Sequence, residues 1–555
     1  MWRQLARHAR PHAWSATTGL ALGLLALGPA LKAGFILSYD MVFVPDPPLG
    51  RADLGLAGGP PRAVPSDLVV AVAARIIPAE VVQRIALLAI FVLACSGAAA
   101  LLAAWPTLPT RGDPPALLAQ LVAGVCYAWN PFVAERLIMG QWALLLGYAG
   151  LPWVLREIRR GDQRIRPGPL CAALLPAAIG GFAAMSISAL AASAVALCAP
   201  PSWPARVRGL VTVLGVVLLL SLIWLIPAFA VPFHADPNGI AAFAARSDTP
   251  FGPVGSLLML GGIWNAEAVP AGYGSWASTG WLLLVLIAAG CSVLLAARQR
   301  ICPGLGIAAV GGAVLAALGL SAPGRAVLAA AISLWSGFAV LRDGQQFLAP
   351  LSLAYAVGLG AGASWLLGHA RRTRPAGSAA GPATALGILA LLAPVLLLPG
   401  LAWGAAGRLH AVQYPADWLR ARQIMASDQR PGSVLLLPWA EYRRYRWNNG
   451  EAVFDPWPRM LARTTIWNDA LRVGPLTVAA ESPQARMLTP IITSGQPITE
   501  ALRAVGVRYV VIDAGPLLGD SGPHLASLAG LPGAQVVLAS RDLILCRIPP
   551  RAGRE

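Results

Sequence analysis

Long apolar runs are the feature that most constrains this chain, because they recur from Trp14 to about Trp403 and then stop. A helix needs about 20 apolar residues to cross the roughly 30 Å hydrocarbon core of a bilayer, and most of the runs approach that length. Charged residues make up only 12% of the chain, whereas they make up about 25% of a typical soluble protein. The sequence therefore predicts a polytopic α-helical membrane protein.

The apolar runs predict about eleven transmembrane helices, of which the fifth and sixth are short. The first run follows basic residues, as in a signal peptide, but it is too long and no small-residue cleavage site follows it. It is therefore interpreted as a retained span. The predicted helices occupy residues 14–36, 84–105, 114–129, 138–155, 169–184, 186–199, 208–232, 276–297, 303–321, 347–368 and 383–404.

The distribution of charge predicts the orientation of these helices, because cytoplasmic loops carry an excess of Lys and Arg. Alternate loops are rich in arginine, and the loops between them carry more acidic than basic residues. This pattern predicts a multi-pass protein of the cell membrane with a cytoplasmic N-terminus and, after an odd number of spans, an extracytoplasmic C-terminus. The inner arginines include Arg111, Arg156, Arg159, Arg160, Arg298, Arg300, Arg371, Arg372 and Arg374.

The same pattern explains most of the net charge of +17. Nucleic acid is not an expected partner, because nucleic-acid binding requires a clustered basic face. Anionic headgroups of membrane lipids are the expected partners of the inner arginines. The cysteines and histidines are scattered, so they predict neither a disulfide framework nor a zinc site. The sequence contains no phosphate-binding loop motif, which disfavours an ATP-driven transporter.

The last part of the chain has a different pattern, with short apolar segments separated by polar ones. Segments 434–439, 507–513, 535–539 and 543–547 are predicted as strands, and 415–427 and 498–505 as helices. We therefore expect a transmembrane domain over residues 1–404 and a small extracytoplasmic α/β domain over residues 405–555. The stretch 439–467 is rich in Trp, Tyr and Arg. It is expected either to bind a glycan or phosphate or to pack on the membrane domain.

Asp40 directly follows the first apolar run, in a predicted outer loop that also contains Asp46. A carboxylate in this place is a candidate general base, although it would equally cap the membrane interface or pair with an arginine. Asp40 and Asp46 together could hold a divalent cation, because hard cations prefer carboxylate oxygens. No other metal site or cofactor is predicted.

Three segments carry a resemblance to a known family. Tyr39-Asp40, the segment from Asn130 through Trp142 to Tyr148, and Leu341-Arg342-Asp343-Gly344-Gln345-Gln346-Phe347 resemble the GT-C membrane glycosyltransferases, and in particular the actinobacterial α-(1→3)-arabinofuranosyltransferases. The resemblance implies an inverting transfer at the outer face, from a polyprenyl-phosphate sugar to a cell-envelope glycan or lipid-linked acceptor. It assigns Asp40 as the general base, with Asp46 as second choice.

The resemblance also implies which residues contact the substrates. Arg136 and Arg342 are the expected partners of the departing phosphate. The full set of expected substrate-binding residues is Asn130, Glu135, Arg136, Gln141, Arg342, Asp343 and Gln346.

The chain departs from the family in two respects. It is much shorter than the arabinofuranosyltransferases, and Arg342-Asp343-Gly344 stands where Arg-Glu-Pro is expected. A non-catalytic membrane scaffold or lipid-glycan carrier of cell-envelope assembly is therefore the main alternative. A secondary transporter is less favoured, because transporters place ionisable groups near the middle of the membrane and these apolar runs carry few charges.

Overall fold

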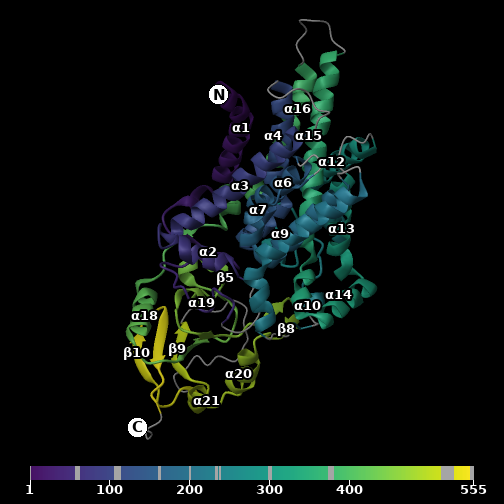
Figure 1. Ribbon diagram of the computed structural model, residues 1–555. Helices are drawn as coiled ribbons and strands as arrows, with labels where there is room; N and C mark the ends of the chain where they lie inside the picture. Colours follow the sequence, from purple (N-terminus) through teal and green to yellow (C-terminus); the bar gives the residue numbers. More distant parts are fainter. Residues whose placement is uncertain are drawn as a thin grey trace.

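The computed structural model describes residues 2–56, 63–104, 114–160, 164–198, 202–231, 235–236, 239–297, 303–372, 381–513 and 530–550. Of the arginines in the predicted inner loops, Arg111, Arg298, Arg300 and Arg374 lie outside these residues. The N-terminus and the C-terminal sheet lie at opposite ends of the molecule (Figure 1).

Each of the predicted spans overlaps a helix of the structure. These helices are α1 (Trp2–Leu27), α3 (Ala79–Ala103), α4 (Pro114–Ala128), α5 (Pro131–Ile138), α6 (Trp142–Arg160), α7 (Pro167–Ile179), α8 (Gly181–Cys198), α9 (Trp203–Ala230), α12 (Thr279–Ala297), α13 (Pro303–Ala317), α15 (Ala349–Arg372) and α16 (Gly381–Leu397).

Fewer helices than predicted are both long and apolar enough to span a bilayer alone. Among the described residues there are 8, or 9 if α16 and the bent segment after it form one span. Two predicted spans account for the difference. Helix α7 has only 13 residues, and α6 carries Arg156, Glu157 and Arg159 in its last turns.

Small residues let the central helices approach closely, as is common in membranes. A Cβ atom added at Gly124 of α4 would lie 2.7 Å from the carbonyl oxygen of Cys95 in α3. One added at Gly360 of α15 would lie 2.8 Å from the carbonyl oxygen of Ala119 in α4. Helices α3, α4 and α15 therefore form a tightly packed centre, in which larger side chains would force the helices apart.

Two short helices expose apolar side chains near the end that carries the sheet. The segment after α2 (Ser66–Ala73) leaves Ile76 85% exposed, and the end of α14 (Ala322–Leu334) leaves Leu334 82% exposed. In a membrane protein, such exposed apolar faces are expected to contact lipid at the interface.

The C-terminal segment forms a five-stranded sheet in the order β10-β11-β9-β3-β6. Strands β3, β6 and β9 are parallel, and β11 and β10 continue the sheet antiparallel. The strands predicted from sequence are confirmed, three of them residue for residue. The strands are β3 (Ser433–Leu437), β6 (Thr465–Ile466), β9 (Val507–Asp513), β10 (Gln535–Ala539) and β11 (Leu543–Arg547).

Helices cover the sheet, including the predicted α18 (Ala416–Ser427) and α21 (Thr499–Ala504) and an additional α20 (Pro483–Thr493). Alternate residues of β3 point to opposite faces. Val434 and Leu436 belong to the hydrophobic core that continues into the membrane helices. Leu435 and Leu437 belong to a smaller core with Leu488 and Leu502. One face of the sheet is thus packed as part of the main core.

The C-terminal region holds the loop after α1, which is the predicted first outer loop, by backbone pairing. Strand β1 (Phe35–Ile36) pairs with β2 (Ala411–Val412), which follows the proposed domain boundary. Farther along the loop, Tyr39 pairs with Val453 of a hairpin formed by β4 (Tyr442–Arg444) and β5 (Ala452–Phe454). The loop that contains Asp40 is therefore fixed between the membrane helices and the sheet domain.

Candidate functional site

Asp40 lies in a sharp turn that packs against the end of α5. Its amide donates a 3.1 Å hydrogen bond to the carbonyl oxygen of Met139, and Tyr39 before it has a φ of +43°. Gly140 makes this approach possible, because a Cβ there would lie 2.1 Å from the carbonyl oxygen of Ser38. Gly140 also has a φ of +77°, which disfavours other residues. The position of Asp40 therefore depends on a glycine 100 residues away.

The β4–β5 hairpin contributes a direct partner for Asp40. The hydroxyl of Tyr442 donates a 2.5 Å hydrogen bond to Oδ1 of Asp40. Tyr39, beside Asp40, donates a 2.5 Å hydrogen bond to Oε2 of Glu267, which also accepts one of 2.5 Å from Nη2 of Arg444. These five side chains come from the first outer loop, the loop before α12 and the hairpin. We call them the Asp40 cluster.

Charge in the Asp40 cluster follows from these contacts. Burial and the hydrogen bond to Glu267 raise the pKa of Tyr39 to about 12, so Tyr39 remains a neutral donor. Burial by itself would raise the pKa of Glu267, but the hydrogen bonds from Tyr39 and Arg444 lower it below its ordinary value. Glu267 therefore remains ionised at neutral pH and holds Arg444 in place.

The hairpin is anchored from its inner side by Arg443, between Tyr442 and Arg444. Arg443 is 2% exposed and lies 2.9 Å from Oδ2 of Asp513 and 2.8 Å from Oδ2 of Asp455. Burial raises the pKa of Asp513 to about 7, although the charge of Arg443 opposes this shift. One guanidinium thus faces two buried carboxyl groups. We call these residues the Arg443 triad.

Arg136, an expected phosphate partner, is committed to an ion pair. Its side chain is 1% exposed and donates hydrogen bonds of 2.9 and 3.3 Å to the two carboxylate oxygens of Asp343. It also donates one of 2.8 Å to Oε1 of Gln141 and lies over the ring of Phe132. The structure thus brings Arg136, Gln141 and Asp343 together, and joins α5 to the segment before α15.

Arg342 is also paired, but with the C-terminal domain. Its Nη2 donates a 2.9 Å hydrogen bond to Oε1 of Glu481, and both side chains are less than 10% exposed, at 9% and 3%. Its guanidinium lies over the ring of Phe243. Gln346, in the same segment, is buried and donates a hydrogen bond to the carbonyl oxygen of Val340. Arg342 therefore links the outer loops to the sheet domain.

Asn130 is fully buried at the start of α5 and caps that helix. Its Oδ1 accepts a 3.1 Å hydrogen bond from the amide of Val133, and its Nδ2 donates to the carbonyl oxygens of Cys126 and Tyr127 and to the hydroxyl of Tyr148. Asn130 is followed by a proline, as is common in the first turn of a helix. Its contacts hold α4, α5 and α6 together.

Glu135 lies 2% exposed on α5, next to Asp248. Asp248 accepts a hydrogen bond of 2.9 Å from the amide of Ile263 and another from the amide of Gly262. Burial raises the pKa of Asp248, so this carboxyl is suited to share a proton with its neighbour. The pair fixes the loop before α12 against α5.

Asp46, the second candidate base, is 89% exposed. Its carboxylate lies 3.9 Å from Nη1 of Arg422, and Arg422 also donates a hydrogen bond to the backbone carbonyl of Asp46. An arginine partner does not suit a cation ligand, and Asp40 is bonded to Tyr442. Within the described part of the chain, no three or more His, Cys, Asp or Glu side chains form a metal-binding group. Asp46 thus faces an arginine and Asp40 a tyrosine hydroxyl, and the suggested divalent cation stays a prediction.

The structure thus divides the predicted site residues into separate groups. Arg136, Gln141 and Asp343 form one group, Glu135 joins Asp248, and Arg342 joins Glu481. The predicted site residues did not include Tyr442, Arg444 or Glu267. The stretch 439–467, which contains the first two, was expected either to bind a glycan or phosphate or to pack on the membrane domain, and the structure packs it against the first outer loop.

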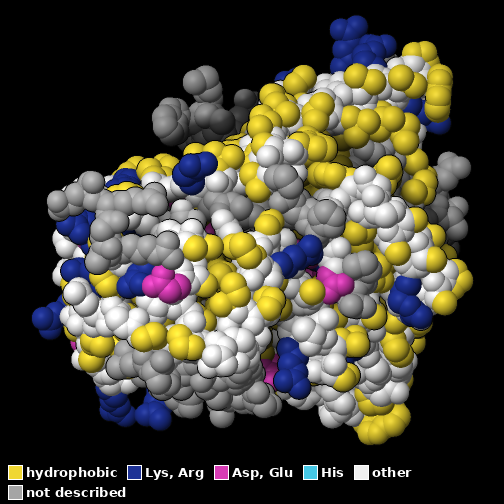
Figure 2. Space-filling view, turned by 90° about the horizontal axis from the view of Figure 1, so that it is seen from below, with side chains coloured by type: hydrophobic (Ala, Val, Ile, Leu, Met, Phe, Trp, Pro, Cys, Tyr) yellow, Lys and Arg dark blue, Asp and Glu magenta, His cyan; other side chains and the backbone are white. Residues whose placement is uncertain are grey.

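Figure 2 shows the sheet-bearing end of the molecule, where the visible acidic side chains each lie beside Lys or Arg side chains. Apolar side chains gather along one part of this view. Acidic groups at this end are thus mostly in basic surroundings, as the ion pairs of Glu267 and Asp67 illustrate.

The chain matches no protein-family model and no curated protein. Its fold is similar to the cryo-EM structure of arabinofuranosyltransferase AftD from Mycobacteria, with a TM-score of 0.57 and 17% identity over 97% of this chain and 40% of that one. An AftD variant, R1389S, gives a TM-score of 0.54 at 18% identity, over 97% of this chain and 41% of the other. The chain thus spans less than half the length of these proteins. It shares its fold with the part of AftD that it covers, in line with the resemblance of the loop segments.

Proposed function

We propose that this chain is a membrane glycosyltransferase that acts at the outer face of the cell membrane. The donor is a polyprenyl-phosphate sugar, and the acceptor is a cell-envelope glycan or a lipid-linked saccharide. The observation that carries the proposal is the position of Asp40. It is a partly exposed carboxylate held by Tyr442, at the junction of the first outer loop, α5 and the hairpin of the sheet domain. The shared fold supports the same class of reaction.

In the proposed reaction, Asp40 takes the proton from the acceptor hydroxyl as its oxygen attacks the anomeric carbon of the donor. The bond from the anomeric carbon to the phosphate oxygen breaks, and the electron pair leaves with the polyprenyl phosphate. A single displacement of this kind inverts the anomeric configuration. Tyr442 orients the carboxylate through its hydrogen bond to Oδ1. The base is thus held in place before the acceptor arrives.

The departing phosphate requires positive charge, and Arg444 is better suited to this role than the arginines predicted from sequence. Arg136 and Arg342 are buried and held by carboxylates. Arg444 is also held, by Glu267 at Nη2 and by the carbonyl oxygen of Gly450 at Nη1, but it is 26% exposed and lies in the same strand as Tyr442. We assign Arg136 and Arg342 to positioning the outer loops. Asp46 is not favoured as the base, because its side chain is 89% exposed and faces Arg422.

The Asp40→Asn variant tests this assignment. Amide replacement keeps the shape of the side chain but removes the base, and general-base catalysis typically contributes about 10²- to 10⁴-fold. We expect transfer from defined polyprenyl-phosphate sugars to fall by that factor in membranes carrying Asp40→Asn, whereas the matched Asp46→Asn variant should retain activity. Undiminished transfer by Asp40→Asn would remove Asp40 as the base. No transfer by the unaltered protein with any such donor would favour the non-catalytic scaffold or carrier.

A further inference from the structure

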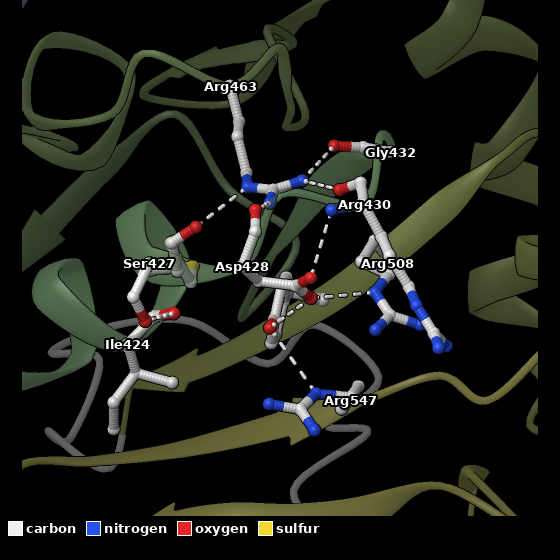
Figure 3. Close-up of polar contacts among 10 residues, drawn as sticks. Ile424, Ser427, Asp428, Arg430, Gly432, Arg463, Arg508 and Arg547 are labelled. Atoms are coloured by element: carbon white, nitrogen blue, oxygen red, sulfur yellow. Dashed lines mark hydrogen bonds and ion pairs between the residues drawn. The ribbon is translucent and has the colours of Figure 1, made fainter.

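A second group of charged side chains lies in the sheet domain, apart from the Asp40 cluster. The guanidinium carbons of Arg463, Arg508 and Arg547 lie 5.5, 5.9 and 5.6 Å from the ring centroid of Tyr509. Figure 3 shows these arginines approaching Asp428 and its neighbours from three directions. We call this group the Tyr509 cluster.

The Tyr509 cluster is electropositive even though it contains a carboxylate. Oδ2 of Asp428 accepts hydrogen bonds of 2.7 Å from the Tyr509 hydroxyl and 2.9 Å from Nε of Arg508. The hydrogen bond from Tyr509 and that from the amide of Arg430 hold the pKa of Asp428 well below its ordinary value, so it is ionised. One negative charge therefore faces three guanidinium groups.

Arg463 has a structural role in this cluster. Its Nε donates a 3.0 Å hydrogen bond to the carbonyl oxygen of Met425, and its Nη1 donates to those of Arg430 and Gly432. Its Nη2 donates to the carbonyl oxygen of Asp428. Arg463 thus closes the C-terminal end of α18, where carbonyl groups otherwise lack partners.

Arg508 and Arg547 are different, because each uses only Nε in a hydrogen bond. Nε of Arg508 donates to Asp428, and Nε of Arg547 donates to the Tyr509 hydroxyl at 3.3 Å. Within the part of the chain that the structure describes, their Nη groups donate to no side chain or carbonyl. These Nη atoms are also absent from the set of buried polar atoms without a partner, so they are not buried. These Nη groups therefore reach solvent. Two guanidinium forks in this position are suited to a planar or tetrahedral oxyanion.

The Tyr509 cluster lies away from the membrane helices. Helix α18 starts beside the first outer loop, where the hydroxyl of Tyr414 donates to the carbonyl oxygen of Phe43, and runs about 18 Å to its end. Arg508 stands at the opposite end of β9 from Asp513 of the Arg443 triad, about 17 Å along the strand. The cluster is thus about the length of one helix away from the first outer loop, a distance that an extended glycan starting near Asp40 is suited to span.

We propose that Arg508 and Arg547 form a binding site for an acidic glycan, through a phosphate, sulfate or carboxylate group on that glycan. The site fixes one end of the glycan on the sheet domain, away from the membrane. That this glycan is also the acceptor of the transfer reaction rests on the proposed function. Binding itself does not depend on it.

The experiment measures binding of a fluorescent heparin-derived hexasaccharide to the full-length protein in detergent, without donor. A neutral dextran oligosaccharide is the control ligand. The double variant Arg508→Gln/Arg547→Gln is compared with Arg541→Gln, which removes an exposed positive charge from the turn at the other end of β11. We expect saturable binding that weakens at least tenfold in the double variant and less than twofold in Arg541→Gln. Inorganic phosphate should compete for the same site.

Further variants distinguish loss of the binding site from loss of folding. Arg508→Lys and Arg547→Lys retain the charge but not the fork, and should give intermediate affinities. Binding that is absent, or equal in the double variant and Arg541→Gln, would overturn the proposal. So would binding of phosphatidylglycerol vesicles through Arg508 and Arg547 in place of the hexasaccharide. Asp40→Asn should lose transfer but still bind, so the two proposals fail independently.

Discussion

The Arg443 triad predicts that the hairpin beside Asp40 becomes less stable as pH rises. A buried guanidinium faces two carboxyl groups, Asp455 and Asp513, so a proton on Asp513 balances the charge. The pKa of Asp513 is about 7 in the folded protein, against about 3.9 for an unperturbed Asp. Because the folded state binds this proton more tightly, its contribution to stability is fully present below about pH 4. The contribution decreases as pH rises and is lost above about pH 7.

The size of the effect follows from this shift. A difference of about three pKa units corresponds to roughly 4 kcal/mol, of which roughly 3 kcal/mol is lost between pH 5 and pH 8. Hydrogen exchange of peptides from β4 and β5 measures the local opening free energy. After correction for intrinsic exchange rates, we expect the local opening free energy of the unaltered protein to fall by roughly 3 kcal/mol between pH 5 and pH 8. In Asp513→Asn it should stay nearly constant, because one carboxylate then pairs with one guanidinium.

Two comparisons make this prediction specific. Asp542→Asn changes a carboxyl group in the turn between β10 and β11, and should keep the full pH dependence. Arg443→Met leaves two buried carboxyl groups without their partner and should destabilise the hairpin by about 3 to 5 kcal/mol. A pH dependence that is the same in Asp513→Asn and in the unaltered protein would refute the reasoning.

Three further substitutions follow from the contacts around α5. Gly140→Ala should displace the turn that holds Asp40, because the added Cβ would lie 2.1 Å from a backbone oxygen. Sugar transfer should therefore fall even at temperatures at which the variant is still folded. Transfer equal to that of the unaltered protein in a membrane assay would contradict this. Asn130→Ala should destabilise the protein by about 1 to 2 kcal/mol through loss of the helix cap, measured by thermal unfolding in detergent. The control is Ser352→Ala, which removes a 3.3 Å partner of Asn130 Nδ2 and leaves the cap at Oδ1 in place. Arg136→Lys should lose the paired hydrogen bonds to Asp343 and lower the unfolding temperature, whereas an unchanged temperature would show that the pair contributes nothing.

Local features of the sequence predicted much of the fold. Apolar runs located every long helix, because helix length in a membrane is fixed by bilayer thickness. Short β-branched segments located β9, β10 and β11 to the residue. Helix α5 was not among the predicted spans, although Asn130 before a proline is a local signal for a helix start. The sequence predicted more independent spans than the described residues contain, because α6 ends in charged residues and α7 is short.

The candidate site was only partly predictable. The sequence identified Asp40 as an acid after the first apolar run, but its partner Tyr442 is 402 positions away. Arg342 and Glu481 are separated by 139 positions. All three arginines have carboxylate partners, and nothing in local patterning indicates that Arg136 and Arg342 are buried while Arg444 is partly exposed. Such pairings depend on how the sheet domain packs on the outer loops.

The sequence by itself determined that the chain spans a membrane, where its helices lie and which segments form the sheet, because these properties follow from hydrophobicity and spacing along the chain. Tertiary structure decided which charged residues are buried in ion pairs and which stay partly exposed. A buried charge is stable only with a partner, and partners here come from segments far apart in sequence. Asp40, Tyr442 and Arg444 form one cluster because the β4–β5 hairpin packs against the first outer loop.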